Sequence, residues 1–149
     1  SLNSGAISSS GTVTGTSFVG IATSARYADL AEKYTADAEY APGTVVSFGG
    51  DAEVTSSTDA DTRVAGVVST NPAFTMNNNL VADHVVTVAF TGRVPCRVAG
   101  TVRKGDLMVS AGNGLARAEA NPAPGTIIGK ALANHDGAEG TIEVVVGRF

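Results

Sequence analysis

The chain has no tryptophan, a single cysteine and few aromatic side chains, and these shortages exclude several classes of protein. Aromatic residues make up 5% of its 149 residues and charged residues 16%, below the quarter that is usual in soluble domains. One cysteine, Cys96, cannot form an intrachain disulfide and is too few for a structural zinc site. No apolar run is long enough for a transmembrane helix or a signal peptide. We therefore expect no metal site, no membrane insertion and a surface rich in Ser, Thr, Asn, Gly and Ala.

Basic residues are scarce in the first three-fifths of the chain. Up to Thr91 there are nine acidic and three basic residues, whereas from Gly92 onward there are five acidic and seven basic ones. The formal net charge of −4 argues against a nucleic-acid partner, because phosphate binding requires clustered Lys and Arg. The uneven distribution predicts that the two parts attract each other or another copy of the chain.

Valine, alanine and 18 glycines are what the sequence has in abundance, and this mixture favours short strands joined by tight turns. Residues 44–48 and 52–55 flank two glycines and predict a hairpin. Residues 85–90 alternate, with Val86, Val88 and Phe90 expected on one face. About nine such strands at nearly regular spacing predict a mainly β fold, a compact antiparallel β-barrel or sandwich.

A short repeat supports a barrel built from related halves. Residues 41–46 read APGTVV and residues 123–128 read APGTII. Pro-Gly before a β-branched run predicts a type II turn that leads into a strand.

The stretch 26–35 predicts the only helix, a short one that joins two regions. Tyr27, Leu30, Ala31 and Tyr34 are spaced at i, i+3, i+4 and i+7, which places them on one helical face. Residues 1–24 are too rich in Gly, Ser and Thr to form a core of their own. We expect an extended leader at 1–24 and a β-barrel domain at 25–149; a flexible linker is the alternative for the leader. A start at Ser1 rather than Met is typical of a fragment or a processed product.

Motifs for chemistry are few, and no cofactor is expected. The sequence has no P-loop and no Gly-x-Ser-x-Gly elbow, and His84 and His135 each stand without a cluster of other ligands. The segment from Ser69 to Pro72 has two interpretations. It is an Asn-Pro turn that ends a strand, or a loop whose hydroxyl or amide attacks a nearby backbone carbonyl.

Six segments in a fixed order resemble a known group of proteins. They are RYADLAEKY at 26–34, PGTVV at 42–46, VAGVVSTNP at 64–72, TGRVPC at 91–96, RKGDLMV at 103–109 and IGKAL at 128–132. The series is similar to the C-terminal domains of tail-fibre and virion structural proteins of tailed phages, especially marine and cyanobacterial ones. Residues 11–20, GTVTGTSFVG, resemble the repetitive shafts of those fibres.

This resemblance implies a non-enzymatic structural module that trimerises and caps a fibre. The partners would be two further copies of the chain and other virion fibre proteins, in a virion assembled in the host cytoplasm. Phe18, Tyr27, Leu30 and Tyr34 are the residues expected to carry assembly.

Two other functions remain open. A more distant similarity to the peptidase G2 domain, a self-cleaving intramolecular chaperone, implies autoproteolysis, for which Ser69, Glu32 and Asp29 are the candidate residues. Host receptor or glycan binding is the other, with residues 71–84 as the contact loop and Phe74, Met76 and Asn78 as its main residues. An exposed Phe74 favours adhesion, and a buried one favours assembly.

Overall fold

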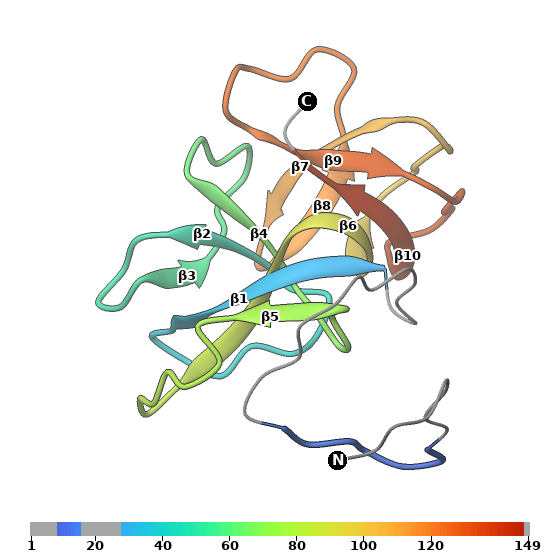
Figure 1. Cartoon of the computed structure of the whole chain (residues 1–149). Helices are drawn as coiled ribbons and strands as arrows, with labels where there is room; N and C mark the ends of the chain where they lie inside the picture. The colour runs from blue at the N-terminus through green and yellow to red at the C-terminus, as the bar shows by residue number, and fades with distance from the viewer. Residues whose placement is uncertain (1–8, 16–27, 148–149) are drawn as a thin grey trace.

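The computed structural model describes residues 9–15 and 28–147, and in these residues the regular secondary structure is entirely β (Figure 1). The mainly β prediction is confirmed. The strands are β1 (Asp29–Thr35), β2 (Val45–Phe48), β3 (Val54–Ser56), β4 (Val64–Val68), β5 (Phe74–Met76), β6 (Val85–Ala99), β7 (Leu107–Gly112), β8 (Leu115–Ala118), β9 (Ile127–Ala131) and β10 (Glu139–Val146). Within these ranges, no helix is long and apolar enough to cross a membrane.

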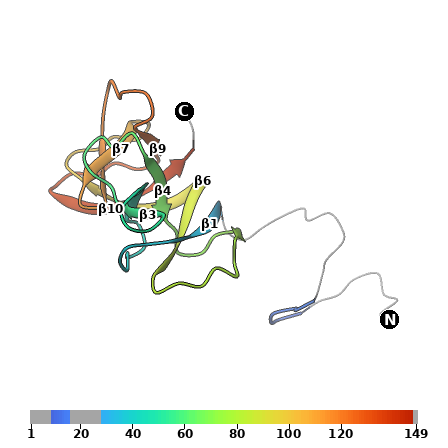
Figure 2. The ribbon, with the colours of Figure 1, turned by 90° about the vertical axis from the view of Figure 1, so that its left-hand side faces the viewer.

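The 15-residue strand β6 belongs to two parts of the structure. Its second half lies in a small closed barrel with strand order β6-β8-β7-β9-β10, which closes because β10 pairs with β6. Its first half lies in a second sheet with order β5-β1-β6-β4-β2-β3, which we call the N-terminal sheet. Both parts therefore share one continuous backbone (Figures 1 and 2).

The structure has two hydrophobic cores, and valine dominates both. The larger one fills the barrel and extends to Val45, Val67 and Ala89 of the N-terminal sheet. Alternate residues of the second half of β6, Val94, Cys96 and Val98, point into the barrel, where they pack with Met108 and Val144. The smaller core of the N-terminal sheet contains Val46, Val54, Val68, Val86 and Val88. Small branched side chains fill both cores, which explains how the fold forms with so few aromatic residues.

The repeated Pro-Gly segment forms the same turn in both places, as predicted. The Thr44 amide donates to the Ala41 carbonyl at 3.2 Å, and the Thr126 amide donates to the Ala123 carbonyl at the same distance. Gly43 and Gly125 both have φ of +83°, the conformation that a type II turn requires at this position. The turns lead into β2 and β9, one in each part.

The predicted helix at 26–35 is wrong, because residues 29–35 form strand β1. This strand lies between β5 and β6 and pairs with both, so both backbone edges find partners. An isolated helix of ten residues is only marginally stable, and pairing on both sides outweighs the helical spacing of its apolar residues. Arg26 and Tyr27 lie outside the described residues, as does the predicted boundary between residues 24 and 25.

Gly92 marks the point where β6 passes from one part to the other. It pairs with Asp29, the first residue of β1, and with Val146, the last residue of β10. Its φ is +103°, and a Cβ at this position would collide with the Ala28 carbonyl oxygen and lie 2.7 Å from the Asp29 Cα atom. Only glycine fits this crossing without displacing β1.

Candidate interaction site

Large apolar side chains are exposed on one side of the N-terminal sheet. The exposed fractions are 42% for Leu30, 46% for Phe48, 62% for Phe74 and 38% for Met76. The parallel register of β1 and β5 pairs Leu30 with Phe74 and Glu32 with Met76, which places these side chains beside one another. We call this surface the apolar face and define it by Leu30, Glu32, Tyr34, Phe48, Phe74, Met76 and Phe90.

Alternation along β1 explains why these side chains point outward. Asp29 and Ala31 are buried, whereas Leu30, Glu32 and Tyr34 point to the opposite side of the strand. A strand that is half buried in this way must expose its second side chain set. Leu30 and Tyr34 of that set are large and apolar or aromatic, and contiguous exposed patches of such side chains are typical of interaction sites.

A groove of about 620 Å³ continues the apolar face toward the barrel. Its walls come from the N-terminal sheet, with Tyr34, Phe48 and Phe90, and from the barrel, with Ile127 and Val146. Phe90 reaches the groove because of a β-bulge: Leu30 pairs with Thr91 but Ala31 pairs with Ala89, which leaves Phe90 as the extra residue. A bulge of this kind redirects a side chain from the usual alternation.

Among the residues that the structure describes, Glu32 is the only charged one that lines the groove. The Tyr34 hydroxyl donates a hydrogen bond of 2.8 Å to Glu32 Oε2, and the Tyr34 ring meets the Phe48 ring edge to face with centroids 5.5 Å apart. Burial, together with this hydrogen bond and the Glu32 charge, raises the pKa of Tyr34 to about 12. The phenol therefore stays protonated and remains a donor to Glu32 at neutral pH.

The chemistry of this site favours binding a partner. Aromatic and aliphatic walls around a single carboxylate suit an apolar surface that carries one cation, because the rings attract a cation as well as apolar groups. No cluster of three or more His, Cys, Asp or Glu side chains that would hold a metal ion occurs in residues 9–15 and 28–147.

The site brings together residues that the sequence assigned to two different roles. Leu30 and Tyr34 were expected to carry assembly, and Phe74 and Met76 to form a contact loop; all four lie on the apolar face. Asn78 lies elsewhere, because its carbonyl accepts a hydrogen bond from Lys33 Nζ, on the other side of β1. Phe18 and Tyr27 lie outside the described residues.

Phe48 and Phe90 belong to the site but were missed as functional residues. Phe48 is an aromatic residue next to the Gly49-Gly50 turn, a signal that was available in the sequence. Phe90 was expected to share a face with Val86 and Val88, but the bulge separates it from them. Alternation alone does not reveal a bulge.

The structure does not bring the three cleavage candidates together. Asp29 and Ser69 are buried, and each has a side-chain oxygen, Asp29 Oδ2 and Ser69 Oγ, without a hydrogen-bond partner. Asp29 lies opposite Gly92 of β6, whereas the Ser69 amide donates to the carbonyl of Thr87. Gly92 and Thr87 are five positions apart along β6, which corresponds to roughly 16 Å at about 3.3 Å per residue. No hydrogen bond links any two of Asp29, Glu32 and Ser69 in the described part of the chain.

Cys96 is fully buried in the barrel core. Burial raises the pKa of its thiol to about 12, and Arg97 offsets only part of this effect. The nucleophilic thiolate is therefore scarce at neutral pH.

Comparison with known proteins gives a structural match. No protein-family model and no curated protein sequence matches the chain. The C-terminal fragment of gene product 12 of bacteriophage phi29 has a similar structure, with a TM-score of 0.56 and 14% sequence identity, over 79% of this chain and 99% of that fragment. The two chains share a fold. The phi29 fragment is covered almost completely, so nearly all of its fold is present here.

A second solved structure, the N base of the phi29 head fibre protein gp8.5, matches at a TM-score of 0.48 and 13% identity, over 76% of this chain and 90% of that one. At this level of similarity it adds nothing to the comparison with gene product 12.

Proposed function

We propose that this chain is a non-enzymatic structural module of a phage fibre, which associates into a homotrimer and caps the fibre. The observation that carries the proposal is the fold shared with a bacteriophage protein. The resemblance of six ordered sequence segments to phage fibre domains supports it independently. Virion localisation follows from the same proposal.

The apolar face supports self-association. Leu30, Phe74 and Met76 are exposed on the paired strands β1 and β5, and Phe48 is exposed on β2. Phe48 and Met76 also line the groove. Burial of apolar surface contributes roughly 25 cal/mol per Å² before the costs of association are subtracted. A stable contact buries about 800 Å² on each partner, so the apolar face would form the centre of a larger contact surface.

The leader is part of this proposal. Residues 1–24 are rich in small side chains that gain buried surface only by packing on other chains. In the described segment 9–15, Val13 is 55% exposed and is therefore accessible to another chain.

The molar mass of the full chain in solution tests the proposal. Light scattering should give three times the 14.9 kDa mass of one chain. Deletion of residues 1–24 should reduce the trimer fraction or the melting temperature. A monomeric full chain, or a deletion variant that is equally stable and equally assembled, would contradict the proposed role.

Binding of a host receptor or glycan is the second candidate function, and the exposure of Phe74 favours it. Phe74 is 62% exposed, and exposure was the property expected of an adhesion residue. Binding of the labelled chain to host cells should fall in Phe74→Ala if Phe74 contacts the host. The same variant should change the trimer fraction if Phe74 serves assembly, so the two readouts separate these roles.

Autocleavage remains a prediction. Mass spectrometry of a version extended at its N-terminus would detect a cut, and Asp29→Asn would prevent it if Asp29 takes part. An intact extended chain would remove this function.

A further inference from the structure

Glu32 has a position and surroundings that suit a cation from outside the chain. Its Oε2 atom accepts a hydrogen bond from the Tyr34 hydroxyl, and among residues 9–15 and 28–147 no basic side chain lines the groove. Lys33, its neighbour in sequence, points to the other side of β1, where Nζ donates to the Asn78 carbonyl. A carboxylate beside three aromatic rings gains more from a cation than one surrounded by water, because both the charge and the rings attract it.

Arg93 is a cation exposed on the barrel side of the molecule. It points outward from β6, beside Val145 of β10, and its neighbour Val94 points into the barrel core. Its Nε atom lies 3.3 Å from Glu143 Oε2, and the two side chains are 57% and 46% exposed. Exposed ion pairs contribute little, so Arg93 exchanges this partner readily, and its remaining guanidinium donors are available for a second carboxylate.

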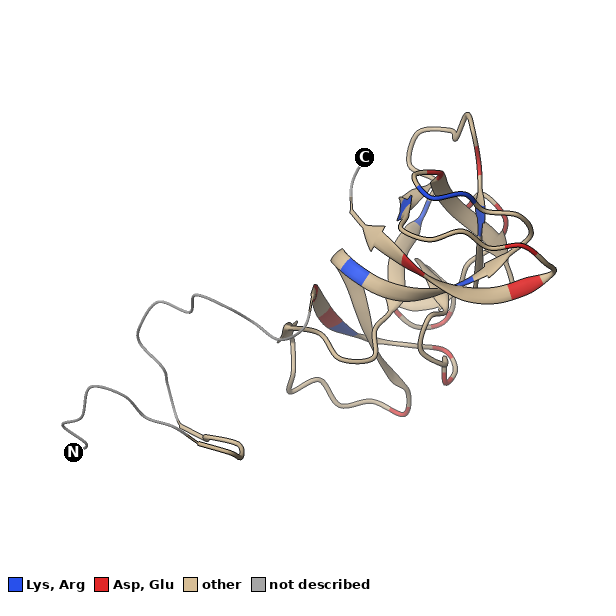
Figure 3. Cartoon of the chain, turned by 90° about the vertical axis from the view of Figure 1, so that its right-hand side faces the viewer, with Lys and Arg blue, Asp and Glu red and all other residues tan. Residues whose placement is uncertain are grey.

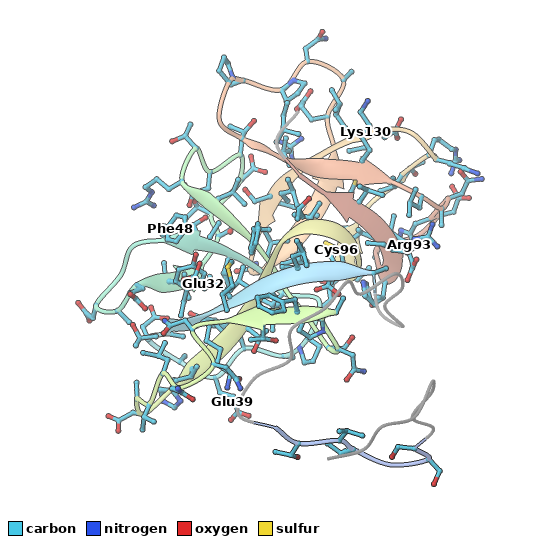
Figure 4. The ribbon with its side chains drawn as sticks, viewed as in Figure 1. Glu32, Glu39, Phe48, Arg93, Cys96 and Lys130 are labelled. Atoms are coloured by element: carbon cyan, nitrogen blue, oxygen red, sulfur yellow. The ribbon has the colours of Figure 1, made fainter. Side chains whose placement is uncertain are left out.

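Glu32 and Arg93 lie on different sides of the molecule (Figure 4). They therefore do not meet within one chain but are placed to meet between two. A contact between different surfaces of identical chains is heterologous, and such contacts form closed rings when the rotation between copies closes.

The overall charge distribution agrees with this arrangement. Most Lys and Arg residues lie in the barrel (Figure 3), whereas the part of the chain up to Thr91 holds nine of the 14 acidic residues. The acidic N-terminal sheet of one copy would face the more basic barrel of the next. Complementary charges of this kind favour one orientation over others.

We propose that the apolar face and groove of one copy bind the Arg93 and Val145 surface of the next copy. Glu32 pairs with the incoming guanidinium, Tyr34 and Phe48 lie against it, and Val145 covers the aliphatic part of the face. This inference rests on the proposed self-association and identifies the surface that produces it.

Charge reversal in the full chain tests the contact. Glu32→Arg and Arg93→Glu should each weaken assembly about fivefold per contact, or roughly a hundredfold for the three contacts of a trimer. The double variant Glu32→Arg with Arg93→Glu restores opposite charges and should recover most of the loss. Light scattering over a dilution series measures each dissociation constant.

Two exposed residues outside the proposed contact provide matched controls. Glu39→Arg and Lys104→Glu make the same changes of charge and should leave the dissociation constant within about twofold of the unmodified chain. Thermal unfolding of each variant reports whether it is folded. If a reversal prevents folding, Glu32→Gln and Arg93→Gln replace it and should each still weaken assembly.

Two negative results have different meanings. A monomeric unmodified chain overturns the proposed self-association and this contact with it. The contact alone is overturned if the full chain is a trimer and the Glu32 and Arg93 substitutions change its dissociation constant no more than the control substitutions do. It is also overturned if the double variant does not recover the dissociation constant of the unmodified chain.

Discussion

Replacement of Gly92 by alanine should separate the N-terminal sheet from β6. Gly92 has φ of +103°, where a residue with a Cβ atom is strained by about 1–3 kcal/mol. The added Cβ also meets the Ala28 carbonyl oxygen and lies 2.7 Å from the Asp29 Cα atom, so β1 must move. That movement breaks the hydrogen bond from the Arg93 amide to the Ala28 carbonyl, which contributes about 1 kcal/mol.

The total cost for Gly92→Ala is therefore about 2–4 kcal/mol, or a decrease of roughly 4–16 °C in melting temperature. Gly100→Ala is the matched control. Gly100 also has positive φ, +74°, but a Cβ there has no atom within 4 Å. It should cost about 1–2 kcal/mol through backbone strain alone.

Urea unfolding of both variants, followed by circular dichroism, measures the difference. We expect the free energy of unfolding to be lower by about 1–2 kcal/mol in Gly92→Ala than in Gly100→Ala. Equal values for the two variants would refute the steric part of the reasoning, since only Gly92 has backbone atoms in the way.

Three further outcomes follow from individual side chains. Asp61 is buried; burial opposes its ionisation, but hydrogen bonds from Arg63, Ser47 and Thr58 outweigh this and hold the pKa of Asp61 below its usual value. A carboxyl whose pKa is lowered by folding stabilises the fold at pH values above the pKa of the unfolded carboxyl, and this stabilisation is lost on acidification. Asp61→Asn should therefore lower the free energy of unfolding by about 1–3 kcal/mol at pH 7. The difference in free energy between the two chains should shrink below about pH 4 in urea titrations. Cys96, 0% exposed, should react with a thiol reagent only as fast as the barrel opens, and rapid labelling of the native chain would contradict its burial. Leu30→Asp, at a position 42% exposed, should change the free energy of unfolding by no more than about 0.5 kcal/mol yet reduce the trimer fraction in light scattering; unchanged assembly would remove Leu30 from the contact.

The local features of the fold were predictable because they depend on neighbouring residues. Val45–Phe48 and Val54–Ser56 form the predicted hairpin, and both Pro-Gly turns have the conformation that their sequence requires. In each case the turn residues and the β-branched strand residues favour the same structure.

Strand β1 was not predictable in this way, because its partners are distant in sequence. Leu30 pairs with Phe74 on one side and with Thr91 on the other. The apolar spacing that indicated a helix is also compatible with a strand whose Leu30, Glu32 and Tyr34 point outward. Long-range pairing decided between these two possibilities, and one sequence does not show it.

The candidate site was only partly predictable for a related reason. Leu30, Tyr34, Phe74 and Met76 were each selected, but nothing in the sequence placed them on one surface. Their proximity results from the parallel pairing of β1 and β5, and the groove beside them requires the barrel as a second wall.

The meeting of Asp29 and Val146 at Gly92 determines how the folded part would respond to mechanical load. Force applied between these two residues acts first on the hydrogen bonds at the start of β1 and at the end of β10. Both sets of hydrogen bonds lie at the same point of β6. Each strand would then be peeled from β6 one bond after another, since the bonds farther along each strand carry no load until the first has broken. A pull on Asp29 and Thr35 in opposite directions would instead stretch β1 alone. The direction of tension therefore decides whether β1 and β10 are peeled from the middle of β6 or the pairing with β6 is left unloaded.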